Sequence, residues 1–245
     1  MSLKYEFLKC AVKAVGLKKK WIGKSAEDLI EARRRSNSKI TVPKLKDNAF
    51  DISTADVMGF QVLQMIHRQK TEKANLFLIG GGMISAPRPG AVKKAFRFAK
   101  ETGLDVFVPY YPLCTDYPLT KAYEMIHATY KMMLEHYEAE NISVLGTSSG
   151  GNLALGMVPY INDGHGDTHM PGYIMAISPG TCVDTDEEWQ RMLELDKVDV
   201  AIPASYMKTA EEIMLHGDDS VPDYMIRLQK ADFTGCPKVT FIYGS

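Results

Sequence analysis

The sequence predicts an α/β protein built on an open, mostly parallel and twisted sheet that helices cover on both faces. Two observations predict this fold class. Short apolar runs typical of buried strands alternate with amphipathic helical segments along most of the chain. A serine flanked by glycines also stands between one such strand and the helix that follows. Sites in sheets of this kind form at the carboxyl ends of the strands, so candidate functional residues are sought there.

Two helices are expected before the sheet begins. Residues 3–15 place apolar side chains at near-helical spacing, and Gly16 can end that helix. Ser25 followed by Asp28 is close to a capping box, so a second helix is predicted to begin at Ser25. This basic, helical start differs from the rest of the chain.

Strand patterns begin near residue 48 and then alternate with helices. Strands are predicted in FDIST, FQVLQMIH, NLFLI, LDVFVPYY, NISVLG, GYIMAIS and KVTFIY. Helices are predicted in GAVKKAFRFAKETG, which Gly103 ends, and in TKAYEMIHATYKMMLEHYEAE and GNLALGMVPYI. Residues 184–230 are expected to form mostly acidic helical segments.

Composition excludes several classes of function. The chain of 245 residues has a net charge of -1, which gives no general attraction to nucleic acid. The basic run Lys18–Lys20 is either a contact patch or a solvated helix end. No apolar run has the length of a membrane span, and the N-terminus lacks the apolar stretch of a signal peptide. The four cysteines show no paired spacing, so free thiols and a cytoplasmic location are expected.

The stretch from Gly146 to Gly150 matches G-x-S-x-G and follows the predicted strand ISVL. In this motif the central serine occupies a sharp turn between strand and helix, and its glycines let the two backbones approach. The hydroxyl of Ser148 would then project from the sheet edge at a helix N-terminus, which favours negative charge. Ser148 is therefore the predicted nucleophile, ahead of its neighbour Ser149.

A run of three glycines, Gly80 to Gly82, follows another predicted buried strand. Backbone N–H groups without side chains around them can stabilise an oxyanion, so the N–H groups of Gly81, Gly82 and Ser149 are predicted donors. The alternative is a dinucleotide-binding turn. That motif needs a third spaced glycine leading into a helix, and here Pro87 and Pro89 follow instead.

Three motifs in this order, IGGGM, VPYYPLCTDYPLTKAYEMIHATYKMM and GTSSGGN, resemble the hormone-sensitive-lipase branch of the α/β-hydrolases, the acetyl-esterase-like enzymes. The resemblance covers about residues 70–245. It implies a three-layer α/β-hydrolase sandwich with a helical cap, and hydrolysis of small carboxylic esters without a cofactor. It also implies that residues 1–45 and 183–226 form the cap and that residues 46–182 and 227–245 form the core of one catalytic domain.

Position by position, the resemblance makes Ser148 the nucleophile and Gly81, Gly82 and Ser149 the oxyanion donors, and it gives Asp116 a structural role. The sequence departs from the family pattern at Ile79, where the family usually has a histidine that can hold the glycine loop by hydrogen bonds. With Ile79, other contacts must hold the loop.

The second departure concerns the acid and the base that a serine nucleophile needs. In the family both follow the strand that KVTFIY resembles, so they are expected beyond Ser245, in a chain that continues past that residue. A fold ending on this strand would also expose FIY as an edge. Within the chain, Asp184 and His216 respect the order nucleophile, acid, histidine, although His216 resembles a helix end. His165 and His169 are a weaker candidate for a metal pair.

The sequence thus predicts a serine carboxylesterase that acts on short-chain, acetyl-like acyl esters, with no cofactor and no metal. Two alternatives stay open: a non-catalytic binding protein with the hydrolase fold, and a hydrolase of small amides or formamides. The expected partner is a small-molecule ester, without nucleic acid or a membrane span. The sequence leaves the oligomeric state open, a homodimer included.

Overall fold

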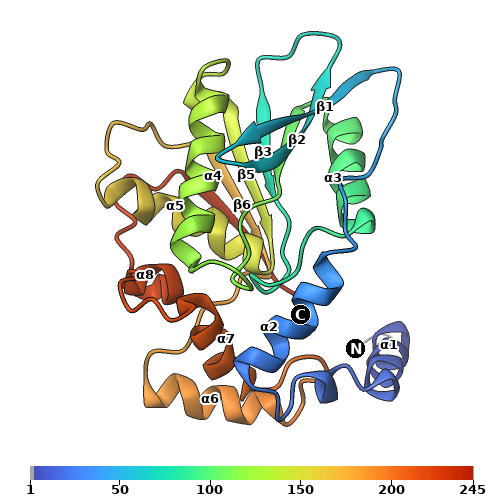
Figure 1. The fold of residues 1–245 in the computed structure, drawn as a ribbon, viewed down its shortest axis with the longest axis vertical. Coiled ribbons are helices and arrows are strands. Elements are labelled where there is room, and N and C mark those ends of the chain that lie inside the picture. The colour runs from blue at the N-terminus through green and yellow to red at the C-terminus, as the bar shows by residue number, and fades with distance from the viewer. Residues whose placement is uncertain (1–2, 245) are drawn as a thin grey trace.

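The computed structural model describes residues 3–244, and in this range the strands form one seven-stranded sheet in the order β1-β2-β4-β3-β5-β6-β7 (Figure 1). Strands β3 to β7 pair in parallel, whereas β1 and β2 pair antiparallel to each other and β2 to β4. The predicted mostly parallel sheet is therefore confirmed. The strands are β1 Phe50–Val57, β2 Phe60–His67, β3 Ala74–Leu78, β4 Asp105–Pro109, β5 Ile142–Thr147, β6 Tyr173–Ile177 and β7 Lys238–Ile242.

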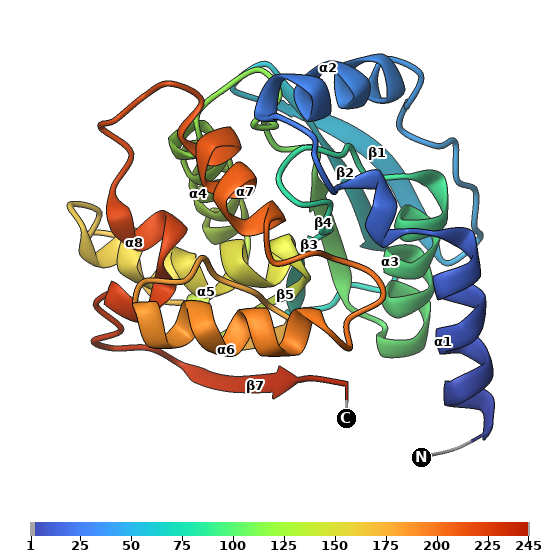
Figure 2. The ribbon, with the colours of Figure 1, turned by 90° about the horizontal axis from the view of Figure 1, so that it is seen from below.

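Helices lie on both faces of the sheet and across one end of it (Figures 1 and 2). The helices are α1 Leu3–Val15, α2 Ala26–Asn37, α3 Pro89–Thr102, α4 Leu119–Leu134, α5 Ser149–Asn162, α6 Asp186–Asp196, α7 Tyr206–Leu215 and α8 Asp223–Ile226. Short 3-10 turns occupy Lys18–Lys20, Ala139–Asn141 and Leu228–Lys230.

Two buried apolar clusters fill the space on either side of the sheet. Along β3, Leu76 and Leu78 belong to the cluster shared with α4 and α5, whereas Phe77 belongs to the cluster shared with α3. Because successive side chains of a strand point to opposite faces, this alternation places one helix layer on each face. The fold is the predicted three-layer arrangement.

Local sequence signals set several helix ends as predicted. Ser25 accepts a hydrogen bond from the Asp28 backbone and Asp28 returns it, which completes a capping box at the start of α2. Gly103 ends α3 with a left-handed φ of 69°, a conformation that glycine adopts without strain.

Helix α4 is shorter than predicted. The apolar periodicity continues beyond Leu134 and therefore predicted a longer helix. Helix α4 stops at Leu134, and the chain then turns inward so that the hydroxyl of Tyr137 donates a 2.6 Å hydrogen bond to the buried Asp105 at the start of β4. This tertiary contact ends the helix.

Helices α2, α6 and α7 lie across the carboxyl ends of the strands, and α1 stands to one side of them; we call these four helices the end layer (Figures 1 and 2). The end layer comes from two segments of the chain, one with α1 and α2 and one with α6 and α7. The ammonium of Lys18 joins them through a 2.9 Å ion pair with Asp196 at the end of α6. Lys18 is therefore part of an internal contact between segments.

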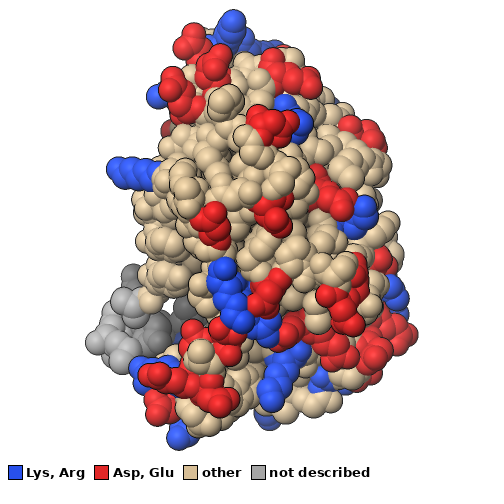
Figure 3. All heavy atoms as spheres, turned by 90° about the vertical axis from the view of Figure 1, so that its left-hand side faces the viewer, with Lys and Arg blue, Asp and Glu red and all other residues tan. Residues whose placement is uncertain are grey.

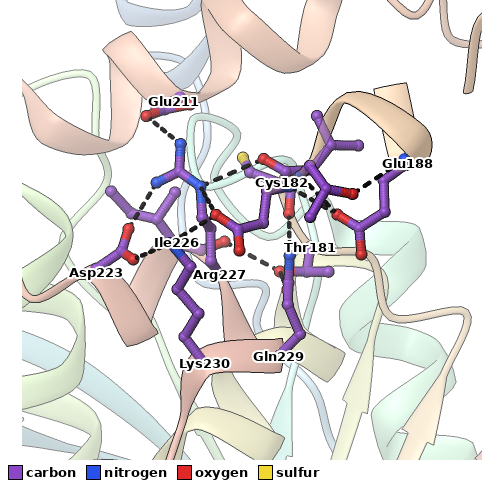
Figure 4. Close-up of polar contacts among 12 residues, drawn as sticks. Thr181, Cys182, Glu188, Glu211, Asp223, Ile226, Arg227, Gln229 and Lys230 are labelled. Carbon is purple, nitrogen blue, oxygen red and sulfur yellow. Dashed lines mark hydrogen bonds and ion pairs between the residues drawn. The ribbon is translucent and has the colours of Figure 1, made fainter. Parts of the chain in front are cut away.

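The guanidinium of Arg227 ties α7 to α8. It contacts Glu211 and Asp223 at 2.6 Å each, with its side chain only 17% exposed (Figure 4). Asp184 pairs with Lys230. The acidic residues of this part of the chain thus neutralise one partly buried cation, Arg227, and one exposed cation, Lys230.

One edge of the sheet is β7, where Phe241 and Ile242 are 53% and 43% exposed, and Tyr243 directly after it is 62% exposed. Beside it, an apolar groove of about 400 Å³ runs between α5 and β7, with Leu155, Phe233 and Val239 in its lining.

On the face shown in Figure 3, charges of both signs are mixed, most densely toward the end layer. All four cysteines are free thiols, and within residues 3–244 no helix has the length and apolarity needed to cross a membrane.

Candidate active site

Ser148 occupies the turn between β5 and α5 with φ 52° and ψ -126°, a backbone conformation that residues other than glycine rarely adopt. Its N–H donates to the carbonyl of Ile177 at 2.8 Å, and its own carbonyl accepts from Gly151 at 2.8 Å. These bonds hold the strained turn on both sides. Ser148 is thus positioned at the carboxyl edge of the sheet and at the N-terminus of α5.

The glycines around Ser148 are required by close backbone approach. A Cβ on Gly146 would lie 2.0 Å from the carbonyl oxygen of Gly150, and one on Gly150 would lie 2.1 Å from that of Leu78. A Cβ on Gly80 would lie 2.1 Å from the carbonyl oxygen of Thr147 and 2.9 Å from Cβ of Ser148. The glycine loop and the serine turn therefore pack directly against each other.

The predicted oxyanion donors come together here, but they are not equally free. The N–H of Gly81 donates to Oγ of Ser149 at 2.9 Å, and the N–H of Met83 reaches the same oxygen at 3.4 Å. The N–H groups of Gly82 and Ser149 have no partner among the described residues. Two backbone donors are therefore available for a ligand oxygen, and the third is engaged by a side chain.

Other contacts replace the histidine that Ile79 lacks. The hydroxyl of Tyr111 donates to the carbonyl of Ile79 at 2.7 Å, and Oγ1 of Thr147 accepts from the N–H of Gly80 at 3.3 Å. Burial raises the pKa of Tyr111, against a smaller lowering by its hydrogen bond with Ser149, so the phenol stays protonated. The hydroxyls of Tyr111 and Thr147 thus hold the start of the glycine loop.

The end layer holds the far side of the same loop. The side chain of Asn37, at the end of α2, donates to the carbonyl of Ile84 at 2.8 Å and accepts from the N–H of Ala86 at 3.0 Å. Asp116, which the resemblance made structural, accepts a 2.7 Å hydrogen bond from Arg34 of α2 and another from Thr115. Asn37 and Arg34 thus join α2 to loops at the carboxyl edge of the sheet.

No acid and base reach Ser148 among the described residues. Nδ1 of His216 contacts the carbonyl of Cys114 at 3.1 Å, and Asp184 pairs with Lys230 and Arg227. Asp184 and His216 therefore have other partners and do not form a catalytic pair. The prediction of an acid and a histidine beyond Ser245 stays a prediction.

His165 and His169 were the candidates for a metal pair, and the backbone carbonyl of His169 accepts a 2.9 Å hydrogen bond from the hydroxyl of Tyr130. His165 stacks on Tyr160 with ring centroids 4.3 Å apart, and its Nδ1 contacts the Tyr160 carbonyl. His127 lies buried beside it, and burial followed by the charge of His165 lowers its pKa to about 4. No group of three metal-ligating side chains occurs in residues 3–244.

Comparison with known proteins decides the family. A model of the alpha/beta hydrolase fold matches residues 75–245. The chain belongs to the α/β-hydrolase family. A search of curated proteins finds no match for this hydrolase.

Solved α/β-hydrolases share its fold at low sequence identity. A putative esterase from Staphylococcus aureus is 22% identical with a TM-score of 0.73, and the match covers 91% of this chain and 76% of that one. The esterase EstE5, in a crystal soaked with p-nitrophenyl butyrate, is 19% identical with a TM-score of 0.75, covering 98% and 78%. An esterase from the bacterial hormone-sensitive lipase family is 18% identical with a TM-score of 0.68, covering 91% and 80%.

Sequence reasoning on this hydrolase missed the side chains that hold the glycine loop. Tyr111 and Thr147 lie inside the motifs VPYYP and GTSSGGN, so the sequence placed them near the site. It did not show that their hydroxyls bond to the glycine loop. Asn37 lies in the polar end of a helix and shows no distinguishing pattern.

Proposed function

We propose that this hydrolase is a serine carboxylesterase that cleaves short-chain, acetyl-like acyl esters through an acyl-enzyme on Ser148. The observation that carries the proposal is the strained turn of Ser148, which stands against the glycine loop at the start of α5. Residues with such a strained backbone conformation cluster at functional sites. The structural neighbours support the same chemistry, because they are esterases.

In this proposal Oγ of Ser148 attacks the ester carbonyl and a general base takes its proton. The carbonyl oxygen becomes an oxyanion that accepts from the N–H groups of Gly82 and Ser149, and from Gly81 where Oγ of Ser149 releases it. The alcohol leaves with a proton, and water then hydrolyses the acyl-enzyme to the carboxylic acid and free Ser148. The base and the acid that orients it are the residues predicted beyond Ser245.

We also propose that residues 1–45 and 183–226 form a cap on the core of residues 46–182 and 227–245. The ion pair of Lys18 with Asp196 supports this division, because it joins the two cap segments to each other. The free thiols support a reducing compartment, as in the cytoplasm.

A non-catalytic binding protein is the second candidate, and one observation favours it: Oγ of Ser148 has no base beside it among residues 3–244. In that case Ser148 would be an ordinary hydroxyl with the reactivity of an unactivated alcohol.

A fluorophosphonate probe on the full chain separates the two candidates. The esterase predicts one covalent adduct that disappears in Ser148→Ala and persists in Ser149→Ala, which controls for the neighbouring hydroxyl. It also predicts hydrolysis of p-nitrophenyl acetate in the wild type and its loss in Ser148→Ala, with folding retained. A full chain without adduct or hydrolysis would support the binding protein. A panel of acetamides and formamides beside the esters tests the amide alternative.

A further inference from the structure

Tyr206 is a buried side chain of the end layer whose hydroxyl makes no hydrogen bond to the described residues. It is the first residue of α7 and is 8% exposed. Its hydroxyl oxygen is buried and has no hydrogen-bond partner among the described residues. Buried hydroxyls are paired in the large majority of cases, so an unpaired one needs a physical explanation.

The surroundings of Tyr206 fix where this hydroxyl lies. Its ring packs against Trp21, with centroids 4.6 Å apart, and Arg33 of α2 lies over the same indole. The hydroxyl lies 3.2 Å from the point that a Cβ on Gly82 would occupy. The aromatic contact thus anchors the ring in the end layer while the hydroxyl faces the glycine loop.

The hydroxyl is suited to donate a hydrogen bond. Burial raises the pKa of Tyr206 to about 12, against a smaller lowering by Arg33, so the phenol keeps its proton at neutral pH. A protonated phenol is a donor of the kind found in oxyanion holes. It stands beside Gly82, whose own N–H has no partner within residues 3–244, while the N–H of Gly81 is engaged by Ser149.

We propose that Tyr206 is a further catalytic residue, whose hydroxyl donates a hydrogen bond to the carbonyl oxygen of the bound ester beside the N–H groups of Gly82 and Ser149. The inference rests on the proposed esterase function. It gives the end layer a direct part in the reaction. Since the hydroxyl is covered without substrate, an entering ester separates α7 locally from the loop and its carbonyl oxygen becomes the missing partner of Tyr206.

The test is Tyr206→Phe in the full chain, which removes the hydroxyl and keeps the ring against Trp21. Steady-state kinetics with p-nitrophenyl acetate and p-nitrophenyl butyrate should show kcat lowered on the order of 100-fold for both esters, with little change in KM. The Ki of a trifluoromethyl ketone, which forms an oxyanion on a serine, should rise by a similar factor.

Tyr123→Phe is the matched control, because Tyr123 also has a buried hydroxyl without a partner in the described part of the chain but lies in α4. Its kcat should stay at the wild-type value. A kcat within twofold of wild type in Tyr206→Phe would overturn the inference. So would a loss of kcat without any change in Ki, because a purely structural role of the ring predicts no selective loss of oxyanion binding. A wild type without Ser148-dependent hydrolysis would overturn the proposed function itself, and this inference with it.

Discussion

The N–H of Gly81 donates a 2.9 Å hydrogen bond to the side chain of Ser149, the residue directly after the candidate nucleophile. One side chain at the first position of α5 therefore fixes the glycine loop relative to the serine turn. An alanine at this position would leave the N–H groups of Gly81 and Met83 without this acceptor.

Replacing Ser149 with alanine should lower kcat/KM for p-nitrophenyl acetate by about tenfold, because the loop loses the contact that sets the spacing of its donors. Ser149→Thr keeps the hydroxyl and is the matched control, with activity near wild type. Equal or higher activity in Ser149→Ala would show that the bond is dispensable and that Gly81 serves better when free.

Restoring the family histidine in Ile79→His should destabilise the protein and bring no gain in rate. The Ile79 side chain is 4% exposed and packs in the apolar cluster with Val108 and Leu145, so an imidazole there would be buried without a partner. A cost of about 1–3 kcal/mol in the free energy of unfolding is expected from urea denaturation. Ile79→Val, which keeps the site apolar, should lose less, and a stabilised Ile79→His would contradict the packing argument.

The contact between Tyr123 and Gly156 predicts two opposite effects on stability. A Cβ on Gly156 would lie 2.0 Å from the hydroxyl oxygen and 2.7 Å from the ring carbon that carries it, so Gly156→Ala should cost about 1–3 kcal/mol by overpacking. Tyr123→Phe removes a buried hydroxyl that has no hydrogen-bond partner between residues 3 and 244, and it should be neutral or stabilising. Thermal unfolding of both variants checks this, and a clear loss in Tyr123→Phe would reveal a partner for the hydroxyl.

His127 should make the fold less stable in mild acid. Its pKa is lowered to about 4 in the folded protein by burial first and the charge of His165 second, from the ordinary value of 6.5. Between these values the unfolded chain binds the proton more tightly, so this contribution is complete above pH 6.5 and is lost as the pH falls toward 4.

The predicted loss for His127 is up to about 3 kcal/mol over that window, at about 1.4 kcal/mol per pKa unit. His127→Gln cannot take up the proton and can still bond Thr168, so the pH dependence of its unfolding midpoint should be flatter than that of wild type. Parallel curves for the two proteins would assign the acid sensitivity to other groups.

The sequence predicted most of the fold because its signals are local. Alternation in FQVLQMIH, the capping box at Ser25 and the glycine after α3 each act within a few residues. The end of α4 was not predictable, because the bond between Tyr137 and Asp105 crosses distant parts of the chain.

The same distinction separates the parts of the candidate site. The strained turn at Ser148 follows from a local motif that requires glycines at fixed spacing. The bond from Gly81 to Ser149 and the approach of Tyr206 to Gly82 join residues far apart in the sequence, so only the folded chain reveals them.

Tyr111 and Thr147 hold the start of the glycine loop where the family usually has an imidazole. A histidine has an ordinary pKa of about 6.5, whereas alcohols and phenols change charge only far above neutrality, and burial moves the pKa of Tyr111 higher still. The anchoring of this loop is therefore indifferent to proton concentration from about pH 5 to pH 9. If the proposed esterase function holds, a single step in the pH–rate profile within this range would therefore report the titration of the catalytic base and not of the loop anchors.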